Sequence, residues 1–323
     1  MADYGEPGTI RGGSPHAHIA SAPRTSNDGS GRGGRALVVG SAIGAAAAAA
    51  TVTPNTVAPA GGSAPVTYLA LGTSLAVGYQ PGRGETTKGY VDDLWRTMKE
   101  QIPGLDLRNV GCRGETSRSM ITGENSACDY AAGSQLDAAV AYLEAHPGEV
   151  AFITIEVGAN DLVNRCMHWR TGQLDKACAV EQSPRQQSRL THIVDALATA
   201  GPGVPIVAMT YYNPLLGFWG LVPGGRSLAH ADQRVWSVMN TGLATAYAAA
   251  GATVADVAAT FRIDDFTDTV RVPGRGRIPV NVALACKWTW FCSTKHPFDF
   301  HANATGYMKI AHTFHHELRS LLP

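Results

Sequence analysis

The segment YLALGTSLAVGY, residues 68–79, decides the fold of this 323-residue chain. An apolar run stops at Gly72, Thr73 and Ser74, and apolar residues resume immediately afterwards. This pattern predicts a buried strand that ends near Gly72 and a helix that begins at about Leu75. A strand followed at once by a helix is typical of an α/β protein, so the same unit is expected to recur along the chain.

Apolar strands and amphipathic helices alternate along the rest of the sequence. The predicted strands are VTYLAL at 66–71, LDLRNV at 105–110, VAFITIEV at 150–157, VPIVAMT at 204–210 and ATVADV at 252–257. The predicted helices cover residues 89–101, 134–146, 184–200 (starting at Pro184), 227–250 and 303–319. Alternation of this kind indicates a five-stranded parallel sheet with helices on both faces, in one domain.

The first 60 residues differ from this pattern. Arg32 and Arg35 precede the apolar run 36–52, and Ala58 and Ala60 form a small-x-small cleavage site. This order predicts a tail plus a secretory signal peptide cut near Ala60, with a retained N-terminal anchor as the alternative. The folded domain is then expected over residues 61–323, in a secreted, extracellular protein or one held at the cell envelope.

Composition excludes one class of partner. Hydrophobic residues make up 45% of the chain, and 26 Lys and Arg balance 26 Asp and Glu. A nucleic-acid-binding domain usually carries a marked basic excess, so we expect no nucleic-acid partner.

Six cysteines follow the predicted cleavage site, as three pairs that are close in sequence. In an oxidising compartment, local pairing is the simplest of the fifteen possible connectivities. The expected disulfides are Cys112–Cys128, Cys166–Cys178 and Cys286–Cys292. Zinc is the alternative, but no Cys-x-x-Cys or close Cys/His set favours it, so we expect no metal.

Polar residues at the carboxyl ends of the predicted strands form the candidate site. Serine is a weak nucleophile unless a histidine takes its proton and fixed donors stabilise the oxyanion. Ser74, at the start of the expected helix, is the candidate nucleophile, and His301 is the candidate base. Gly114 leaves its backbone N–H open to an oxyanion, and Asn160 can add a side-chain amide.

Four ordered blocks carry a resemblance to a known family. GTSLAVGY, NVGCRGETS, GAND and DFHANATGY occur in the order and spacing of the SGNH, or GDSL-type, hydrolase superfamily. The chain most resembles the secreted actinobacterial esterases and lipases of that superfamily, over roughly residues 66–320. The resemblance implies a flavodoxin-like three-layer αβα sandwich and no cofactor. It also implies that Ser74 is the nucleophile, that His301 is the base, and that Ser74, Gly114 and Asn160 line the oxyanion hole.

Two departures from the family pattern concern the site. Thr73 stands where the family usually has Asp, a residue that is not the catalytic acid, so we expect little effect. Asp299 lies two residues before His301 rather than three. Either Asp299 orients the imidazole, which we favour, or a backbone carbonyl near Phe298 does so.

Other polar and aromatic residues have simpler interpretations. His296 lacks the sequence context of His301 and is the weaker candidate for the base. Glu156 lies in an apolar strand and is expected to be a buried, hydrogen-bonded carboxylate. Trp288 and Trp290 are expected either to line an acyl pocket or simply to pack.

The predicted function is hydrolysis of acyl esters by an exported serine esterase or lipase through an acyl-enzyme. A carbohydrate O-acetylesterase or a phospholipase on the same machinery stays open, as does a secreted lipid-binding protein without turnover. The expected partner is an ester or lipid substrate, and the protein is expected to be a monomer. Residues 211–225 are apolar enough to border a lipid-binding face, with Phe218 and Trp219 as contacts.

Overall fold

The computed structural model describes residues 66–322. The predicted tail, signal peptide or anchor at residues 1–60 lies outside the described residues. Among the helices of residues 66–322, none combines the length and the apolarity needed to cross a membrane.

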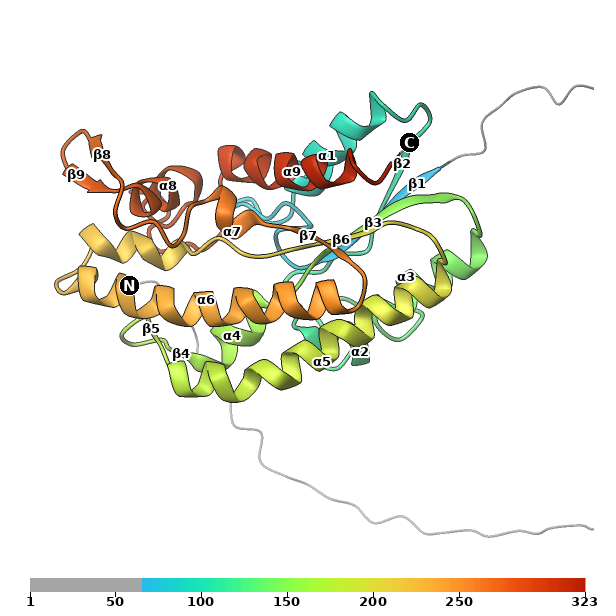
Figure 1. The fold of residues 1–323 in the computed structure, drawn as a ribbon, viewed down its shortest axis with the longest axis horizontal. Coiled ribbons are helices and arrows are strands. Elements are labelled where there is room, and N and C mark those ends of the chain that lie inside the picture. Colours follow the sequence, from blue (N-terminus) through green and yellow to red (C-terminus); the bar gives the residue numbers. More distant parts are fainter. Residues whose placement is uncertain (1–65, 323) are drawn as a thin grey trace, which may run out of the picture. The chain divides into compact units, whose positions relative to one another are not determined.

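A parallel sheet forms the centre of the fold, in the order β2-β1-β3-β6-β7 (Figure 1). Its strands are β1 (Thr67–Gly72), β2 (Asp106–Asn109), β3 (Val150–Glu156), β6 (Ile206–Met209) and β7 (Thr253–Ala255). The chain passes from β1 to β2 on one side and then crosses to β3 on the other, so the strand order reverses between β1 and β3. In open α/β sheets, ligands bind at the carboxyl ends of the strands that flank such a point.

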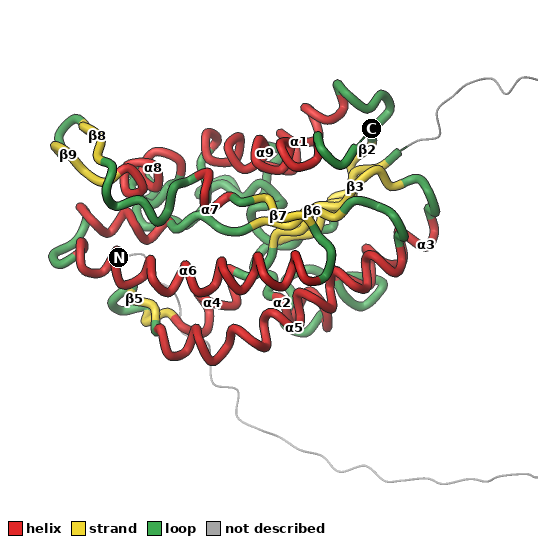
Figure 2. Tube along the Cα trace, in the orientation of Figure 1, coloured by secondary structure: helices red, strands yellow, loops and turns green. Residues whose placement is uncertain are grey.

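Helices cover both faces of the sheet, which gives three layers (Figure 2). One layer contains α1 (Tyr90–Lys99), α7 (Val257–Thr260), α8 (Val280–Trp288) and α9 (Ala304–Leu318). The other contains α2 (Ser117–Thr122), α3 (Gln135–Ala145), α4 (Ala159–Cys166), α5 (Lys176–Ala200) and α6 (Gly225–Ala249). Every residue of β1 is buried because helices pack over both of its faces, as its continuous apolar sequence predicts. The predicted αβα sandwich with five parallel strands is confirmed.

Three small elements complete the fold beside the sheet. Two hairpins pair β4 (Met167–His168) with β5 (Gln173–Leu174), and β8 (Thr269–Val272) with β9 (Gly276–Pro279). A 3₁₀ segment, η1 (Pro214–Gly220), follows β6.

The prediction that a helix begins at about Leu75 is wrong. Residues after Ser74 form a single turn, and the first helix of the described chain begins only at Tyr90. Gly78 ends the turn with φ +60, and a Cβ there would lie 2.6 Å from the backbone nitrogen of Gly89. The chain therefore turns and crosses itself closely at these two glycines instead of extending a helix.

The predicted start of one helix at Pro184 is also wrong. Helix α5 begins at Lys176, because Asp175 caps it by accepting hydrogen bonds from the backbone N–H groups of Ala177 and Cys178. Pro184 lies inside the helix on an exposed side, where the unpaired carbonyl of the preceding turn can be hydrated.

Three disulfides join Cys112 to Cys128, Cys166 to Cys178, and Cys286 to Cys292. The first closes the loop between β2 and α3, and the second holds the β4–β5 hairpin against the start of α5. The third closes the end of α8. Each bond therefore restrains a segment that the sheet does not hold.

Candidate active site

The turn that carries Ser74 is fixed by buried hydrogen bonds from two sides. Backbone N–H and hydroxyl of Thr73 donate to the carboxylate of Glu156 at the end of β3, at 2.8 and 2.9 Å. From α3, the side-chain amide of Gln135 accepts from the backbone N–H of Gly72 at 2.7 Å and donates to its carbonyl at 3.1 Å. Ser74 itself is 9% exposed and lines a cavity.

A segment near the far end of the chain brings the imidazole of His301 and the carboxylate of Asp299 to this turn. Its Nε2 lies 2.9 Å from Oγ of Ser74, and its Nδ1 lies 2.8 Å from Oδ1 of Asp299. Asp299 therefore reaches the imidazole in spite of the shortened spacing. Ser74, His301 and Asp299 form the hydrogen-bonded series that a nucleophile, a base and an orienting acid require.

Neighbouring backbone and rings hold the imidazole in place. The backbone N–H of Trp290 donates to the carbonyl of His301 at 2.9 Å, and the hydroxyl of Tyr212 donates to the carbonyl of Phe300 at 3.0 Å. The ring of Tyr79 packs 4.3 Å from the imidazole, centroid to centroid. The sequence analysis did not predict a role for Tyr79, although Tyr79 is the last residue of the segment 68–79 that contains Ser74.

The two expected oxyanion donors after β2 and β3 lie on linked segments. Gly114 adopts φ +84, a conformation that favours glycine. Asn160, at the start of α4, donates from its side-chain amide to the carbonyl of Glu115 at 2.8 Å. Within residues 66–322, the backbone N–H groups of Ser74 and Gly114 donate to no protein acceptor. They are therefore available to a ligand, as is the second amide hydrogen of Asn160.

Asp161 joins the same two segments by a second contact. Its carboxylate accepts from the backbone N–H and the hydroxyl of Ser117 at the start of α2, at 2.8 and 2.5 Å. Burial raises the pKa of this carboxyl, and the bonds to Ser117 and the nearby Arg189 oppose that rise. The loop that carries Gly114 is thus tied to α4 at two points on its C-terminal side, Glu115 and Ser117.

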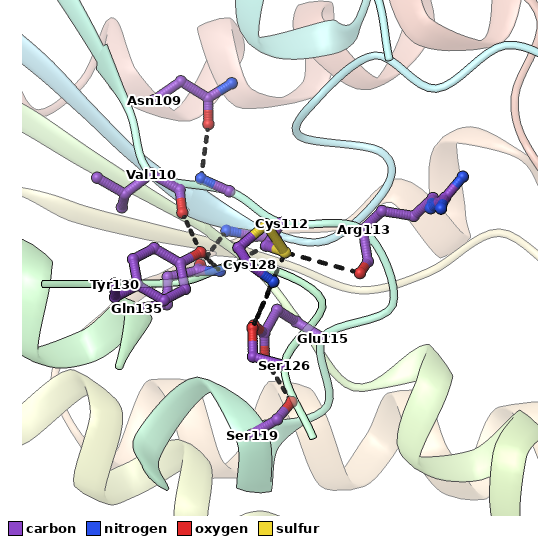
Figure 3. The surroundings of a disulfide bond; sticks show 12 residues. Asn109, Val110, Cys112, Arg113, Glu115, Ser119, Ser126, Cys128, Tyr130 and Gln135 are labelled. Atoms are coloured by element: carbon purple, nitrogen blue, oxygen red, sulfur yellow. Dashed lines mark hydrogen bonds between the residues drawn. A yellow bond between two sulfur atoms is a disulfide. The ribbon is translucent and has the colours of Figure 1, made fainter. Parts of the chain in front are cut away.

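Figure 3 shows the disulfide that stiffens this loop, with Glu115 beside it. The carboxylate of Glu115 is buried and accepts hydrogen bonds from the hydroxyls of Ser119 and Ser126. The hydroxyl of Tyr130 donates to the carbonyl of Val110 at 2.7 Å, next to Cys112. Residues on both sides of Gly114, Cys112 and Glu115, are therefore held by covalent or polar contacts.

A cavity of about 100 Å³ opens between Ser74 and His301. Asn160 and Glu156 also line it, whereas Gly114 does not. Most of its wall is apolar or aromatic: Leu75, Val163, Tyr211, Tyr212, Trp236 and Phe300. The arrangement places the hydroxyl of Ser74 beside a small pocket suited to an apolar group.

Glu156 is buried and hydrogen-bonded, as its apolar strand predicts. Burial raises its pKa to about 7, and the hydrogen bonds from Tyr211 and Thr73 lower it in part. Thr73 thus uses its backbone and hydroxyl to tie the nucleophile turn to β3. Thr73, which stands where the family usually has Asp, therefore helps to position Ser74 through its two hydrogen bonds to Glu156.

Other residues singled out from the sequence lie elsewhere. His296 packs against Trp290, whose indole N–H donates to Gln80, and Trp288 packs on Phe261. The cavity beside Ser74 is lined by none of the three. For the two tryptophans the structure therefore favours packing over an acyl pocket.

The prediction that residues 211–225 border a lipid-binding face is wrong for residues 211–218. Residues 211–218 are buried, and the ring of Phe218 packs against Phe291.

Within residues 66–322, no group of three or more His, Cys, Asp or Glu side chains is placed to hold a metal ion.

Comparison with known proteins identifies the family. The model of the GDSL-like Lipase/Acylhydrolase family matches residues 70–309. The chain belongs to this family. It is accordingly a carboxylic ester hydrolase, in agreement with the four sequence blocks.

Several solved structures are similar at low identity. A lipase, Lip_vut3, from a goat rumen metagenome is 18% identical, with a TM-score of 0.49 over 79% of this chain and 97% of that one. An extracellular lipase from Streptomyces rimosus is 17% identical, with a TM-score of 0.48 over 79% and 99% of the two chains. Phospholipase A1 from Streptomyces albidoflavus NA297 is 13% identical, with a TM-score of 0.44 over 78% and 99%. Among curated proteins, none matches this chain.

Proposed function

We propose that this esterase acts through an acyl-enzyme on Ser74, with His301 as general base and Asp299 as the orienting acid. In the first step, Oγ of Ser74 attacks the ester carbonyl carbon while Nε2 of His301 takes its proton. Asp299 accepts from Nδ1 and so keeps Nε2 directed at the serine.

The negative charge that develops on the carbonyl oxygen is then stabilised by fixed hydrogen-bond donors. The backbone N–H groups of Ser74 and Gly114 and the amide of Asn160 supply them. The tetrahedral intermediate collapses when the bond to the alcohol oxygen breaks, and His301 gives its proton to that oxygen. Water, deprotonated by His301, next attacks the acyl carbon, and release of the acid returns the proton to Ser74.

The observation that carries this proposal is the continuous series from Ser74 Oγ to His301 Nε2 at 2.9 Å and from His301 Nδ1 to Asp299 at 2.8 Å. The series stands at the mouth of an apolar cavity, where an acyl group fits beside the nucleophile. The predicted substrate is therefore an ester whose acyl part is apolar.

Export is part of the same proposal. Three disulfides close the loops around the site, and such bonds persist in oxidising compartments. They support a secreted or cell-envelope protein that meets its substrate outside the cell. Fractionation of cells that express the full chain, with the protein followed by antibody, tests this: recovery in the cytoplasm only would contradict export.

Hydrolysis of p-nitrophenyl esters from acetyl to palmitoyl tests the catalytic proposal. Ser74→Ala is expected to abolish turnover on every ester, whereas Ser227→Ala, an exposed serine on α6, keeps the wild-type rate. Turnover that survives in Ser74→Ala would exclude Ser74 as the nucleophile. The acyl length with the highest kcat/KM distinguishes an acetylesterase from a lipase.

A further inference from the structure

Two large aromatic side chains near the site are exposed to solvent. Trp169, between β4 and β5, is 63% exposed, and Phe298, three residues before His301, is 47% exposed. Side chains of this size are usually buried, since each removes a large apolar area from water when it packs. Their position therefore calls for a functional explanation.

Both residues belong to one continuous group of rings, here named the aromatic strip: Trp169, Phe218, Phe291, Phe298 and Phe300. Trp169 is stacked on Phe300, with 6.3 Å between ring centroids. Phe300 lies 5.8 Å from Phe291, which in turn lies 5.6 Å from Phe298. These separations are those of interacting aromatic pairs.

Phe300 connects the strip to the chemistry. It lines the cavity beside Ser74 and directly precedes His301. An apolar path therefore runs from the nucleophile, over Phe300, to the exposed ring of Trp169.

The hairpin that presents Trp169 is anchored at several points. The disulfide Cys166–Cys178 closes its base, and the buried carboxylate of Asp232 on α6 accepts from the backbone N–H of Leu174 at 2.9 Å. Gly172, with φ +73, packs so closely on Phe218 that a Cβ would lie 2.5 Å from its ring. The exposure of Trp169 is thus imposed by a fixed hairpin, rather than left to a loose loop.

The backbone at Phe298 supports the same conclusion. Its φ is +61, a region that disfavours bulky residues and accepts Gly or Asn. A phenylalanine held there at a cost in strain, with a half-exposed ring, is typical of a site where the side chain has a task.

The cavity is too small to hold a long acyl chain alone. Its volume of about 100 Å³ is well below the roughly 300–1,000 Å³ of pockets that enclose a drug-sized ligand. We propose that the acyl chain leaves the cavity over Phe300 and lies against the exposed rings of the aromatic strip, Trp169 and Phe298. The other two rings, Phe218 and Phe291, are buried and only pack against these. On this proposal, which rests on the proposed function, the substrates are medium- and long-chain acyl esters.

The test compares two soluble substrates, p-nitrophenyl octanoate at monomeric concentration and p-nitrophenyl acetate. The full chain carries Trp169→Ser, Phe298→Asn or, as a control, Met308→Ser, which removes an exposed apolar side chain from α9. Asn suits the positive φ at 298, so this change removes the ring without adding strain. Circular dichroism of each variant checks the fold.

Each methylene group of the acyl chain that becomes fully buried strengthens binding about fourfold. Several methylene groups that are partly buried against one ring together give an effect of similar size. The ratio of kcat/KM for octanoate to that for acetate is expected to fall about tenfold in Trp169→Ser and in Phe298→Asn. Met308→Ser is expected to keep the wild-type ratio.

An unaltered ratio in a folded Trp169→Ser variant overturns the inference, as does a wild type that hydrolyses acetate and not octanoate. A loss confined to emulsified long-chain esters, with the monomeric ratio unaltered, also overturns it, because the strip would then bind a lipid surface rather than the acyl chain. In all three cases acetate hydrolysis that depends on Ser74 leaves the proposed function standing. A wild type inert on both esters would contradict that function itself.

Discussion

One oxygen of Asp299, Oδ1, accepts two hydrogen bonds from His301: one from Nδ1 at 2.8 Å and one from the backbone N–H at 2.9 Å. Asp299 therefore fixes both the ring and the main chain of His301. This double contact is possible because only one residue, Phe300, lies between Asp299 and His301, so the carboxylate folds back over its own chain. The shorter spacing thus changes the local geometry and keeps the contact.

Asp299→Asn is expected to lower kcat by about 10⁴, because the amide favours the wrong imidazole tautomer while its oxygen can still accept from the backbone N–H. The measurement is kcat on p-nitrophenyl acetate. Asp129→Asn, at an exposed aspartate directly after Cys128, is the matched control. A loss of only a few fold in Asp299→Asn would show that a backbone carbonyl suffices to orient His301.

Asn160→Ala is expected to lower kcat by about 10²–10³ with little change in KM, because its amide stabilises charge that develops only in the transition state. Its bond to the carbonyl of Glu115 is lost as well. Thermal unfolding therefore accompanies the kinetics. A fall in kcat that is matched by a large loss of Tm would indicate a structural role instead.

Glu156 predicts a definite pH dependence of stability. Its pKa is about 7 in the folded protein against 4.5 for the free side chain, because burial disfavours the charged form. Between these two values the folded state holds a proton that the unfolded state has lost, so stability falls as pH rises from 4.5 to 7. The loss is about 3 kcal/mol and persists above that window.

Glu156→Gln removes this titration while leaving an amide oxygen for the N–H of Thr73. We expect its free energy of unfolding, relative to wild type, to rise by about 3 kcal/mol between about pH 5 and about pH 8. Urea unfolding at both values measures it, with Glu181→Gln on the exposed face of α5 as control. Parallel pH profiles for wild type and Glu156→Gln would contradict the assignment. Asp232, whose pKa burial also raises to about 7, adds a slope of the same sign to both proteins.

Removal of the disulfide Cys112–Cys128, by alanine at both positions, is expected to lower the free energy of unfolding by about 3 kcal/mol, as for a loop of this size. Removal of Cys166–Cys178 serves as the comparison. The first change loosens the segment of Gly114 and should lower turnover of acetate and octanoate alike. The second change loosens the hairpin of Trp169 and should lower turnover of octanoate more than turnover of acetate. Equal losses on both esters in this second variant would contradict the prediction that the hairpin contacts the acyl chain.

The sheet and the site were predictable to different degrees. The continuous apolar sequence of β1 and β3 indicated buried parallel strands, and residues at strand ends indicated Ser74 and Asn160. The same rule applied to β6 would have selected Tyr211 and Tyr212, which line the cavity. The sequence instead predicts them to border an exposed lipid-binding face, because apolar character alone does not distinguish a buried wall from a lipid-binding surface.

Other features depended on contacts between distant segments. The turn after Ser74 ends early because Gly78 packs against Gly89. The early start of α5 is different, because Asp175 caps it locally and Asp is a residue type that favours this position. The aromatic strip joins residues more than a hundred positions apart, such as Trp169 and Phe300. Periodicity and local motifs carry no information about such pairings.

Covalent labelling tests the central claim most directly. The full chain and its Ser74→Ala variant are incubated with a p-nitrophenyl alkylphosphonate, in which attack by a serine oxygen forms a P–O bond and expels p-nitrophenolate. We predict one equivalent of p-nitrophenolate and one phosphonate on Ser74, located by peptide mass spectrometry, and no labelling of Ser74→Ala. A label on another residue, or equal labelling of the variant, would contradict the account.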